Sequence, residues 1–435
     1  QFHGTADQYT LSGAAALATL YTDAATATPY PAVALNSVGV SGGQAAAFTY
    51  DLARSVVYSR QGNPAWEGME RDGSAPLRSD DMFYGDAAGD PQLDWIDLSK
   101  VAIPQADEQP RLLANLILNL NFDRKPLPRF WYFPRGEKAV VIMTGDDHGV
   151  TDVDGRLDRH IALSPAGCSV ADWECVRSTA YLYTSSALTD AQALNYHNLG
   201  FELALHVTTG CADYTPASLA SDYATQLAGF AATWPSIPAP STERTHCVAW
   251  SDWAGQAHVE LDNGIRLDTN YYFWPPEWVL NSPGVYTGSG IPMRFADLDG
   301  TMIDVYQVTT QMTDESSQSY PYTINALLDR ALGDEGYYGA FCANMHNDGP
   351  THAGADAIIA SAQARGVPVV SGRQLLIWLD ARNASSFGAL AWAGNTLTFD
   401  VTTTANARNL EGMLPLQAGA ASLVFLSRGG ATVPY

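Results

Sequence analysis

The sequence predicts an α/β fold whose centre is a parallel, barrel-like sheet, and three observations indicate it. Residues 139–143, AVVIM, form a short β-branched apolar run, which is typical of a strand buried on both faces. From about residue 136 to 383, runs of this kind alternate with segments of helical apolar spacing, as in βαβ units. The 435 residues also exceed one ordinary core, so two or three domains are expected.

The predicted elements of the central domain follow one another along the chain. A Thr-Asp start marks a helix over 189–198, and Gly200 separates it from a strand over 201–205. A long amphipathic helix is expected over 217–234. The same alternation places strands or strand ends at 244–250, 264–274, 302–308, 337–345 and 367–370, and helices at 324–332, 353–364 and 374–379.

The two flanking segments differ from this domain. Residues 1–135 indicate a partial α/β unit, with a short strand over 45–50, a helix over 51–59 and helical spacing over 109–121. The polar stretch 60–95 is long for a loop and is expected to pack irregularly. Residues 384–435 alternate apolar and polar positions between Gly and Asn turns, which predicts the antiparallel strands of a small β-sandwich.

The composition limits the class of partner. Lys and Arg number 23 against 46 Asp and Glu, and the net charge of −23 disfavours nucleic acid and anionic membranes. No apolar run approaches the roughly 20 residues of a membrane span. The chain opens at Gln1 without a signal peptide, so we expect a mature or truncated product. Low Lys content and richness in Ala, Thr, Ser and Gly favour a secreted protein.

The five cysteines also point to an oxidising compartment. Cys168 and Cys175 flank the short segment GCSVADWEC and are candidates for a local disulfide. Cys211 and Cys247 either bridge two neighbouring loops or remain buried thiols. Cys342 lies within an apolar strand and is expected in the core. No CxxC spacing occurs, which argues against a structural zinc knuckle.

Polar side chains recur where the predicted strands end. Asp146 and Asp147 follow the first strand. Two adjacent carboxylates repel each other unless a proton or a cation separates them. The alternative is a strand-to-helix turn in which an Asp side chain caps the helix. His206, His246 and His346 end three later strands. Because the carboxyl ends of parallel strands meet at one edge of a sheet, these groups are expected to converge. One Asp and two neutral His are suitable ligands for a three-ligand zinc site with an open position.

These residues and their order resemble the NodB-type polysaccharide deacetylases of the carbohydrate esterase family 4 superfamily. TGDDHG at 144–149, LHVTTG at 205–210, RTHC at 244–247, LDTNYY at 267–272 and NMHND at 344–348 are similar to the five motifs of that family. The resemblance implies a distorted (β/α) barrel of NodB type over 136–383. It also implies Asp146 as catalytic base, Arg244 as the residue that orients it, His346 as general acid, and Asp147 and His206 as metal ligands.

The motifs depart from the family at three positions. Gly210 stands where the second His of the metal pair is expected, Gly145 replaces a Phe, and His148 replaces a Gly. His246 is the preferred replacement ligand because a side chain directly after Asp147 would point away from it. His148 is the alternative.

Two further assignments complete the interpretation. Residues 1–135 resemble part of a glutamine-amidotransferase-like domain, but no Cys precedes position 168, so this segment is expected to be non-catalytic. Asp268 matches the acidic position of the fourth motif. It is expected at the substrate together with Trp250 from an aromatic cluster that also includes Trp253, Tyr271, Tyr272 and Trp274.

The sequence therefore predicts a zinc-dependent deacetylase acting on an acetylated polysaccharide, with N-acetyl preferred over O-acetyl groups. The missing second His motivates the alternative of a catalytically degenerate carbohydrate-binding or surface protein. A third alternative is a metal-dependent hydrolase of another amide or ester, because the same residues would serve that chemistry.

Overall fold

The computed structural model describes the chain except residues 1, 24, 41, 84–93, 150–151 and 272–274. The chain divides into two compact units. The first comprises Val57–Asp107 and Glu137–Leu379, and the second Phe2–Val56, Glu108–Gly136 and Asp380–Tyr435. Residues 57–107 thus belong to the same unit as the predicted central domain, whereas the sequence grouped them with the N-terminal segment.

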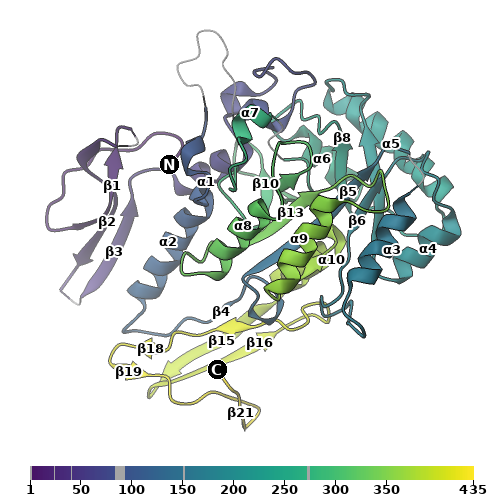
Figure 1. Ribbon diagram of the computed structural model, residues 1–435. Coiled ribbons are helices and arrows are strands. Elements are labelled where there is room, and N and C mark those ends of the chain that lie inside the picture. Colours follow the sequence, from purple (N-terminus) through teal and green to yellow (C-terminus); the bar gives the residue numbers. More distant parts are fainter. Residues whose placement is uncertain (1, 24, 41, 84–93, 150–151, 272–274) are drawn as a thin grey trace. The chain divides into compact units, whose positions relative to one another are not determined.

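The first unit is built on a ten-stranded sheet with the order β10-β11-β9-β8-β7-β6-β5-β13-β12, and β14 also pairs with β5 (Figure 1). Every pairing is parallel except that of β10 with β11. The strands are β5 Ala139–Asp147, β6 Thr179–Leu182, β7 Glu202–Thr208, β8 Thr242–His246, β9 Leu267–Asp268, β10 Met293–Ala296, β11 Met302–Gln307, β12 Thr310–Thr313, β13 Gly339–Asn344 and β14 Val369–Val370. The predicted parallel α/β architecture is confirmed.

The sheet curls into a half-barrel, and the chain path shows why. Strands β11 and β12 lie towards opposite ends of the strand order, yet only residues 308 and 309 separate them. Two residues span less than about 10 Å, so the two edges of the sheet must approach each other. The backbone N–H of Val308 donates to Asp268 and that of Thr310 to Tyr271, at 2.9 and 2.8 Å.

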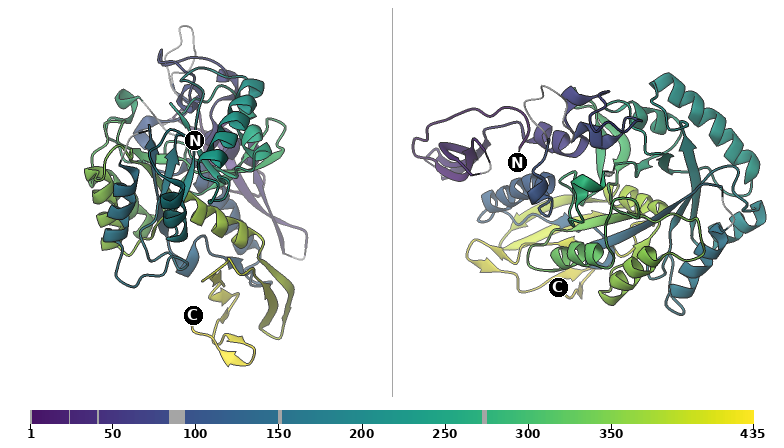
Figure 2. Two further views of the ribbon diagram at one scale, coloured as in Figure 1. Left: turned by 90° about the vertical axis from the view of Figure 1, so that its right-hand side faces the viewer. Right: turned by 45° about the horizontal axis from the view of Figure 1, so that its top comes forward.

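The crossover helices lie on the outer side of the curled sheet (Figure 2). Thr189 and Thr215 begin α4 and α5 with capping boxes, in which the threonine side chain accepts from the third helical N–H. The helices of this unit are α3 Val153–Leu163, α4 Asp190–Asn198, α5 Pro216–Thr233, α6 Gly255–Asp262, α7 Pro276–Val279, α8 Tyr322–Leu332 and α9 Ala353–Ala364, with the 3-10 turns η1 Pro64–Trp66, η2 Ser79–Met82 and η3 Leu98–Lys100.

The core forms where the strands meet these helices. All nine residues of β5 are buried, as the apolar run predicted. One buried cluster joins β5 and β13 to α8 and α9, and a second joins β6 and β7 to α4 and α5.

Two disulfides form. Cys168 pairs with Cys175, as expected, and Cys211 pairs with Cys247, which settles the alternative left open by the sequence. Cys342 is a buried free thiol in β13. The second disulfide joins the loops that follow β7 and β8, and these two strands carry predicted site residues.

The second unit is less regular than its sequence indicated. Its main sheet is antiparallel, with the order β1-β2-β3, so an amidotransferase-like α/β domain is not shown. In place of a β-sandwich, the described C-terminal residues form two-stranded sheets, because most of these strands are only two residues long. The strands are β1 Ala15–Tyr21, β2 Ala27–Val38, β3 Gly43–Phe48, β4 Arg129–Phe130, β15 Ser386–Ala393, β16 Thr396–Thr402, β17 Gly412–Met413, β18 Gln417–Ala418, β19 Ala421–Ser422, β20 Ser427–Arg428 and β21 Ala431–Thr432, with the 3-10 turn η4 Pro134–Gly136.

Three helices continue across the divisions between the units. They are α1 Leu52–Gln61, α2 Gln105–Leu120 and α10 Gly372–Asn383, each close to its predicted position. Among the described residues, no helix combines the length and apolarity needed to cross a membrane.

Candidate functional site

The candidate site lies at the carboxyl ends of five neighbouring strands of the first unit. Strands β8, β7, β6, β5 and β13 are adjacent in that order. Asp146 and Asp147 end β5, His246 ends β8, His206 lies near the end of β7, and His346 follows β13. Parallel pairing brings these ends to one edge of the sheet, which is where ligands bind in such folds.

Asp146 is a buried carboxylate held by two donors. Its side chain is 4 % exposed. The Arg244 guanidinium approaches one oxygen at 3.1 Å, and the Asn344 amide donates to the other at 2.9 Å. Burial opposes ionisation, but the charge and hydrogen bond of Arg244, together with His206 and His346, outweigh it and lower the pKa of Asp146 below its ordinary value. Asp146 is therefore ionised at neutral pH and can accept a proton.

Arg244 is fully buried and fixed by several acceptors. Its Nη1 donates to the hydroxyl of Thr144 at 2.8 Å as well as to Asp146, and its Nη2 donates to the hydroxyl of Thr310 at 2.9 Å. A guanidinium with this many fixed partners cannot swing away, so it holds the Asp146 carboxylate in one orientation.

His206 presents one ring nitrogen to the site. Its Nδ1 lies 2.7 Å from the carbonyl oxygen of Arg244. A carbonyl can only accept, so Nδ1 carries the hydrogen and Nε2 has a free lone pair. That Nε2 atom is buried and has no hydrogen-bond partner among the described residues. Burial lowers the pKa of His206 to about 4, which keeps the imidazole neutral.

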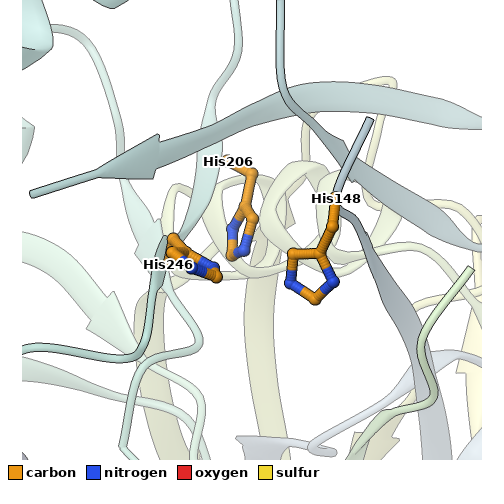
Figure 3. A group of neighbouring side chains, drawn as sticks. All are labelled: His148, His206 and His246. Carbon is orange, nitrogen blue, oxygen red and sulfur yellow. The ribbon is translucent and has the colours of Figure 1, made fainter. Parts of the chain in front are cut away.

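Three histidines converge on this point (Figure 3). One ring nitrogen from each of His148, His206 and His246 lies within 4.8 Å of the others. The ring centroids of His246 lie 5.0 Å from His148 and 5.3 Å from His206. Burial also lowers the pKa of His246. Both candidates for the missing ligand therefore lie beside His206, whereas the sequence treated them as alternatives.

Asp147 lies outside the group of three histidines. It is fully buried, and one of its oxygens accepts the backbone N–H of Gly149 at 3.1 Å. This contact closes a tight turn directly after β5. The resemblance assigned Asp147 to the metal, and the structure places His148, beside it in the sequence, within reach of His206 and His246.

Tyr183 packs against the same histidines and was not singled out from the sequence. It directly follows β6, between the strands that carry Asp147 and His206. Its ring stacks on His206 with centroids 5.3 Å apart and meets His246 edge-on at 5.3 Å. Its position after a strand end, like that of the other site residues, is the signal that could have found it.

His346 faces the cluster from the side of β13. Its ring centroid is 5.0 Å from that of His148, and its Nδ1 lies 2.8 Å from a carboxylate oxygen of Asp314. Burial opposes the charged form, but the hydrogen bond to Asp314 and the negative charges of Asp146, Asp314 and Glu315 together outweigh it and raise the pKa of His346 to about 9. His346 is thus protonated at neutral pH and can donate a proton. Asp314 was not identified from the sequence.

The two predicted substrate-binding residues lie in the interior instead. Trp250 is 2 % exposed and stacks on Phe295 with centroids 5.4 Å apart. Asp268 is fully buried beside Glu243 and Glu260, and burial raises its pKa to about 6. We therefore assign both to the core. Trp253 and Tyr271 are buried as well, and Tyr272 and Trp274 lie outside the described residues.

The glycine at position 145 has a steric cause. A Cβ atom there would lie 2.4 Å from the carbonyl oxygen of Met345 and 2.5 Å from the side chain of Asn347. Asn347 also donates to the carbonyl of Gly145 at 2.8 Å. The segment that carries His346 therefore packs directly on β5, and the Phe of the family motif would not fit.

The donor set suits a zinc ion. Three imidazoles, one of which has a buried lone pair that no described residue satisfies, form a ligand set that zinc accepts. The carbonyl oxygen of Arg244 accepts a hydrogen bond from Nδ1 of His206, and such a hydrogen bond on the second ring nitrogen orients histidines that bind metals.

No protein-family model matches the chain, and no curated protein sequence matches it. Structure comparison finds a Mycobacterium smegmatis protein assigned as a polysaccharide deacetylase, with TM-score 0.38 and 14% identity, over 60% of this chain and 94% of that one. It also finds a polysaccharide deacetylase from Bacillus cereus, with TM-score 0.31 and 10% identity, over 53% and 91% of the two chains. A third match, with TM-score 0.32 and 12% identity over 56% and 66%, is a carbohydrate esterase family 4 pseudoenzyme from Bacillus anthracis. Likeness at this level leaves the function to be inferred from the side chains of the site.

Proposed function

We propose that this chain is a metal-dependent hydrolase that removes acetyl groups, N-acetyl in preference to O-acetyl, from a polysaccharide. One observation supports this proposal above the others. The ionised base Asp146 and the protonated acid His346 both lie beside the group formed by His148, His206 and His246. Acyl transfer to water requires a base, an electrophile and an acid in this arrangement.

His148, His206 and His246 would hold the metal, for which zinc is the preferred candidate. Zinc supplies Lewis acidity, which polarises an acyl carbonyl and makes water acidic enough to react at neutral pH. The proposal replaces Asp147, which the family resemblance indicated, by His148. The reason is that one ring nitrogen from each of the three histidines lies within 4.8 Å of the others, whereas Asp147 is not part of this group.

Asp146 would accept the proton that the attacking water loses. Its 4.0 Å separation from Nε2 of His206 places it at the edge of the histidine cluster. Arg244 and Asn344 hold both carboxylate oxygens, so the base is oriented before substrate arrives.

His346 would protonate the leaving nitrogen when the carbon–nitrogen bond breaks. An amine is a poor leaving group unless it is protonated, whereas an alcohol requires less help. A histidine with a pKa of about 9 is fully charged at neutral pH and suits the harder task. This supports an N-acetyl substrate, with acetate and a free amine as products.

A polymer is favoured by the charge of the chain and by the motif resemblance. The net charge of −23 is compatible with neutral or cationic glycans, and deacetylation of an amino sugar creates positive charge. The two disulfides favour an extracellular location, where such polymers occur.

The test measures zinc and acetate together. Purified protein, loaded with zinc, is incubated with N-acetylglucosamine oligomers and with O-acetylated xylan, and released acetate is quantified. Asp146→Asn should keep zinc and lower turnover about 10²- to 10⁴-fold, the usual contribution of a positioned base. Retained turnover in this variant would remove Asp146 from the mechanism.

Gly210 supports a second candidate function. It occupies the position of a metal His in the resembled motif, so a degenerate, carbohydrate-binding protein remains the alternative. Wild-type protein that binds no zinc after reconstitution, yet binds a glycan measurably, would establish this alternative. Zinc binding with turnover of a different amide or ester would instead keep the chemistry and change the substrate.

A further inference from the structure

His352 lies at the start of α9 and its ring has a defined tautomer. The backbone N–H of Ala355 donates to Nδ1 of His352 at 3.2 Å, as at a helix N-cap. A backbone N–H can only donate, so Nδ1 is the accepting nitrogen. The neutral ring then carries its hydrogen on Nε2.

That Nε2 hydrogen faces Asp314. Nε2 of His352 lies 3.1 Å from Oδ2 of Asp314. The same carboxylate also accepts from His346, through the backbone N–H at 3.1 Å and through Nδ1 at 2.8 Å. Two histidines from separate segments therefore hold Asp314 from two sides.

We propose that His352 is a positioning residue for the acid His346, acting through Asp314. This inference rests on the proposed function. Asp314 follows β12, and its side chain is 17% exposed. The backbone N–H of His346 and the ring of His352 both approach Oδ2, so without His352 a single backbone hydrogen bond would hold that oxygen, and the carboxylate could rotate more freely and weaken its hold on the His346 ring. His352 fixes the carboxylate from the side remote from the ring. Through His352 and Asp314, the start of α9 thereby orients His346, which the family resemblance places at the leaving nitrogen.

A metal ion does not explain these contacts as well. Asp314, Glu315 and His346 also bring ligand atoms within 4.8 Å of one another. However, both oxygens of Asp314 already accept hydrogen bonds, and Nδ1 of His346 is the donor in one of them. Hydrogen-bond donors thus occupy the positions that a cation would need.

A pair of substitutions separates positioning from helix capping. The oxygen of an Asn side chain can occupy the place of Nδ1, and Asn is among the best N-cap residues, but it cannot reach Asp314. The amide nitrogen of a Gln side chain can occupy the place of Nε2 and donate to Asp314, but Gln is a poor N-cap. His352→Asn keeps the cap, and His352→Gln keeps the donor.

The experiment compares both variants as zinc-loaded full-length protein. We expect His352→Asn to lower kcat about 10-fold with KM and melting temperature little changed, a fraction of what a general acid contributes. His352→Gln should restore most of kcat while lowering the melting temperature. The reverse order, with activity retained in His352→Asn and lost in His352→Gln, would reduce His352 to a helix cap.

A spectroscopic readout keeps the test independent of turnover. In protein labelled with ¹⁵N-histidine, the Nδ1–H resonance of His346 is identified by its absence in His346→Gln. It should move in His352→Asn and stay in place in His352→Gln. An unmoved resonance in His352→Asn overturns the inference even if no substrate is found. A moved resonance without acetate release in the wild type would support the positioning and reject the proposed reaction.

Discussion

The carbonyl oxygen of Arg244 lies 2.7 Å from Nδ1 of His206, while the guanidinium of the same residue lies 3.1 Å from Asp146. One residue therefore orients a candidate metal ligand through its backbone and the candidate base through its side chain. The two tasks can be separated by substitution, because every residue type retains the carbonyl.

Arg244→Met should keep zinc and lose turnover. The His206 tautomer is retained, but Asp146 loses its positive partner inside the protein. Burial then dominates, and the pKa of Asp146 should rise. Removing one partner of a buried ion pair also destabilises by about 3–5 kcal/mol, so unfolding is measured in parallel with zinc content and acetate release. Loss of zinc from a folded Arg244→Met variant would contradict this separation.

The ligand set gives a second prediction. Wild-type protein should bind about one zinc per chain, and His148→Ala, His206→Ala and His246→Ala should each lose it. Asp147→Asn should keep it, because Asp147 lies outside the histidine group. The zinc content of each purified variant, measured by mass spectrometry, distinguishes the ligand set with His148 from the one with Asp147. Zinc lost in Asp147→Asn and kept in His148→Ala would restore the ligand set of the family motif.

His148 also shows where strand periodicity stops being informative. Alternation of side chains predicts that His148 points away from Asp147, and this would exclude it from the site. Strand β5 ends at Asp147, however, and the chain then turns through the contact between Asp147 and Gly149. Beyond the last strand residue the two-residue period no longer applies, so the ring reaches His206 and His246.

The remaining site residues fall into two groups, those placed by the ends of strands and those placed by tertiary contacts. Asp146, His206, His246 and His346 could be predicted, because each is at or next to the end of an apolar run and parallel strands align their ends. Asp314 and His352 could not, because their contact with His346 depends on β12 pairing with β13 and on the start of α9. No local pattern encodes that pairing. The burial of Trp250 could not be predicted for the same reason, because it depends on packing against Phe295 of β10.

The pH dependence of turnover should report His346. The acid works only while protonated, so activity is present below its pKa and is lost as pH rises through about 9. The hydrogen bond to Asp314 is the largest of the causes that raise this pKa, ahead of the charges of Asp146 and Glu315, so Asp314→Asn should move the alkaline limb of kcat to lower pH, towards the ordinary value for histidine. If the alkaline limb of kcat stays near pH 9 in Asp314→Asn, a group other than His346 causes that loss of activity.

The Cys211–Cys247 disulfide should support metal binding as well as stability. It ties the loop after β7, where Gly210 replaces the expected His, to the loop after β8, one residue beyond His246. Because the cysteines are 36 positions apart in the sequence, the Cys211→Ser/Cys247→Ser double variant should lose about 4 kcal/mol of unfolding free energy if chain entropy dominates. Zinc affinity should fall too, because His246 loses its anchor.

The Cys168–Cys175 disulfide provides the matched control. Its cysteines are only 7 residues apart, and they lie between α3 and β6, away from the His residues of the site. By the same chain-entropy relation, removing this disulfide should lower the unfolding free energy by about 2 kcal/mol, and zinc affinity should stay unchanged. Equal loss of zinc affinity in both double variants would mean that the metal responds to overall stability. Loss confined to Cys211→Ser/Cys247→Ser would mean that the disulfide holds His246 in the place that the missing His of the motif would otherwise fill.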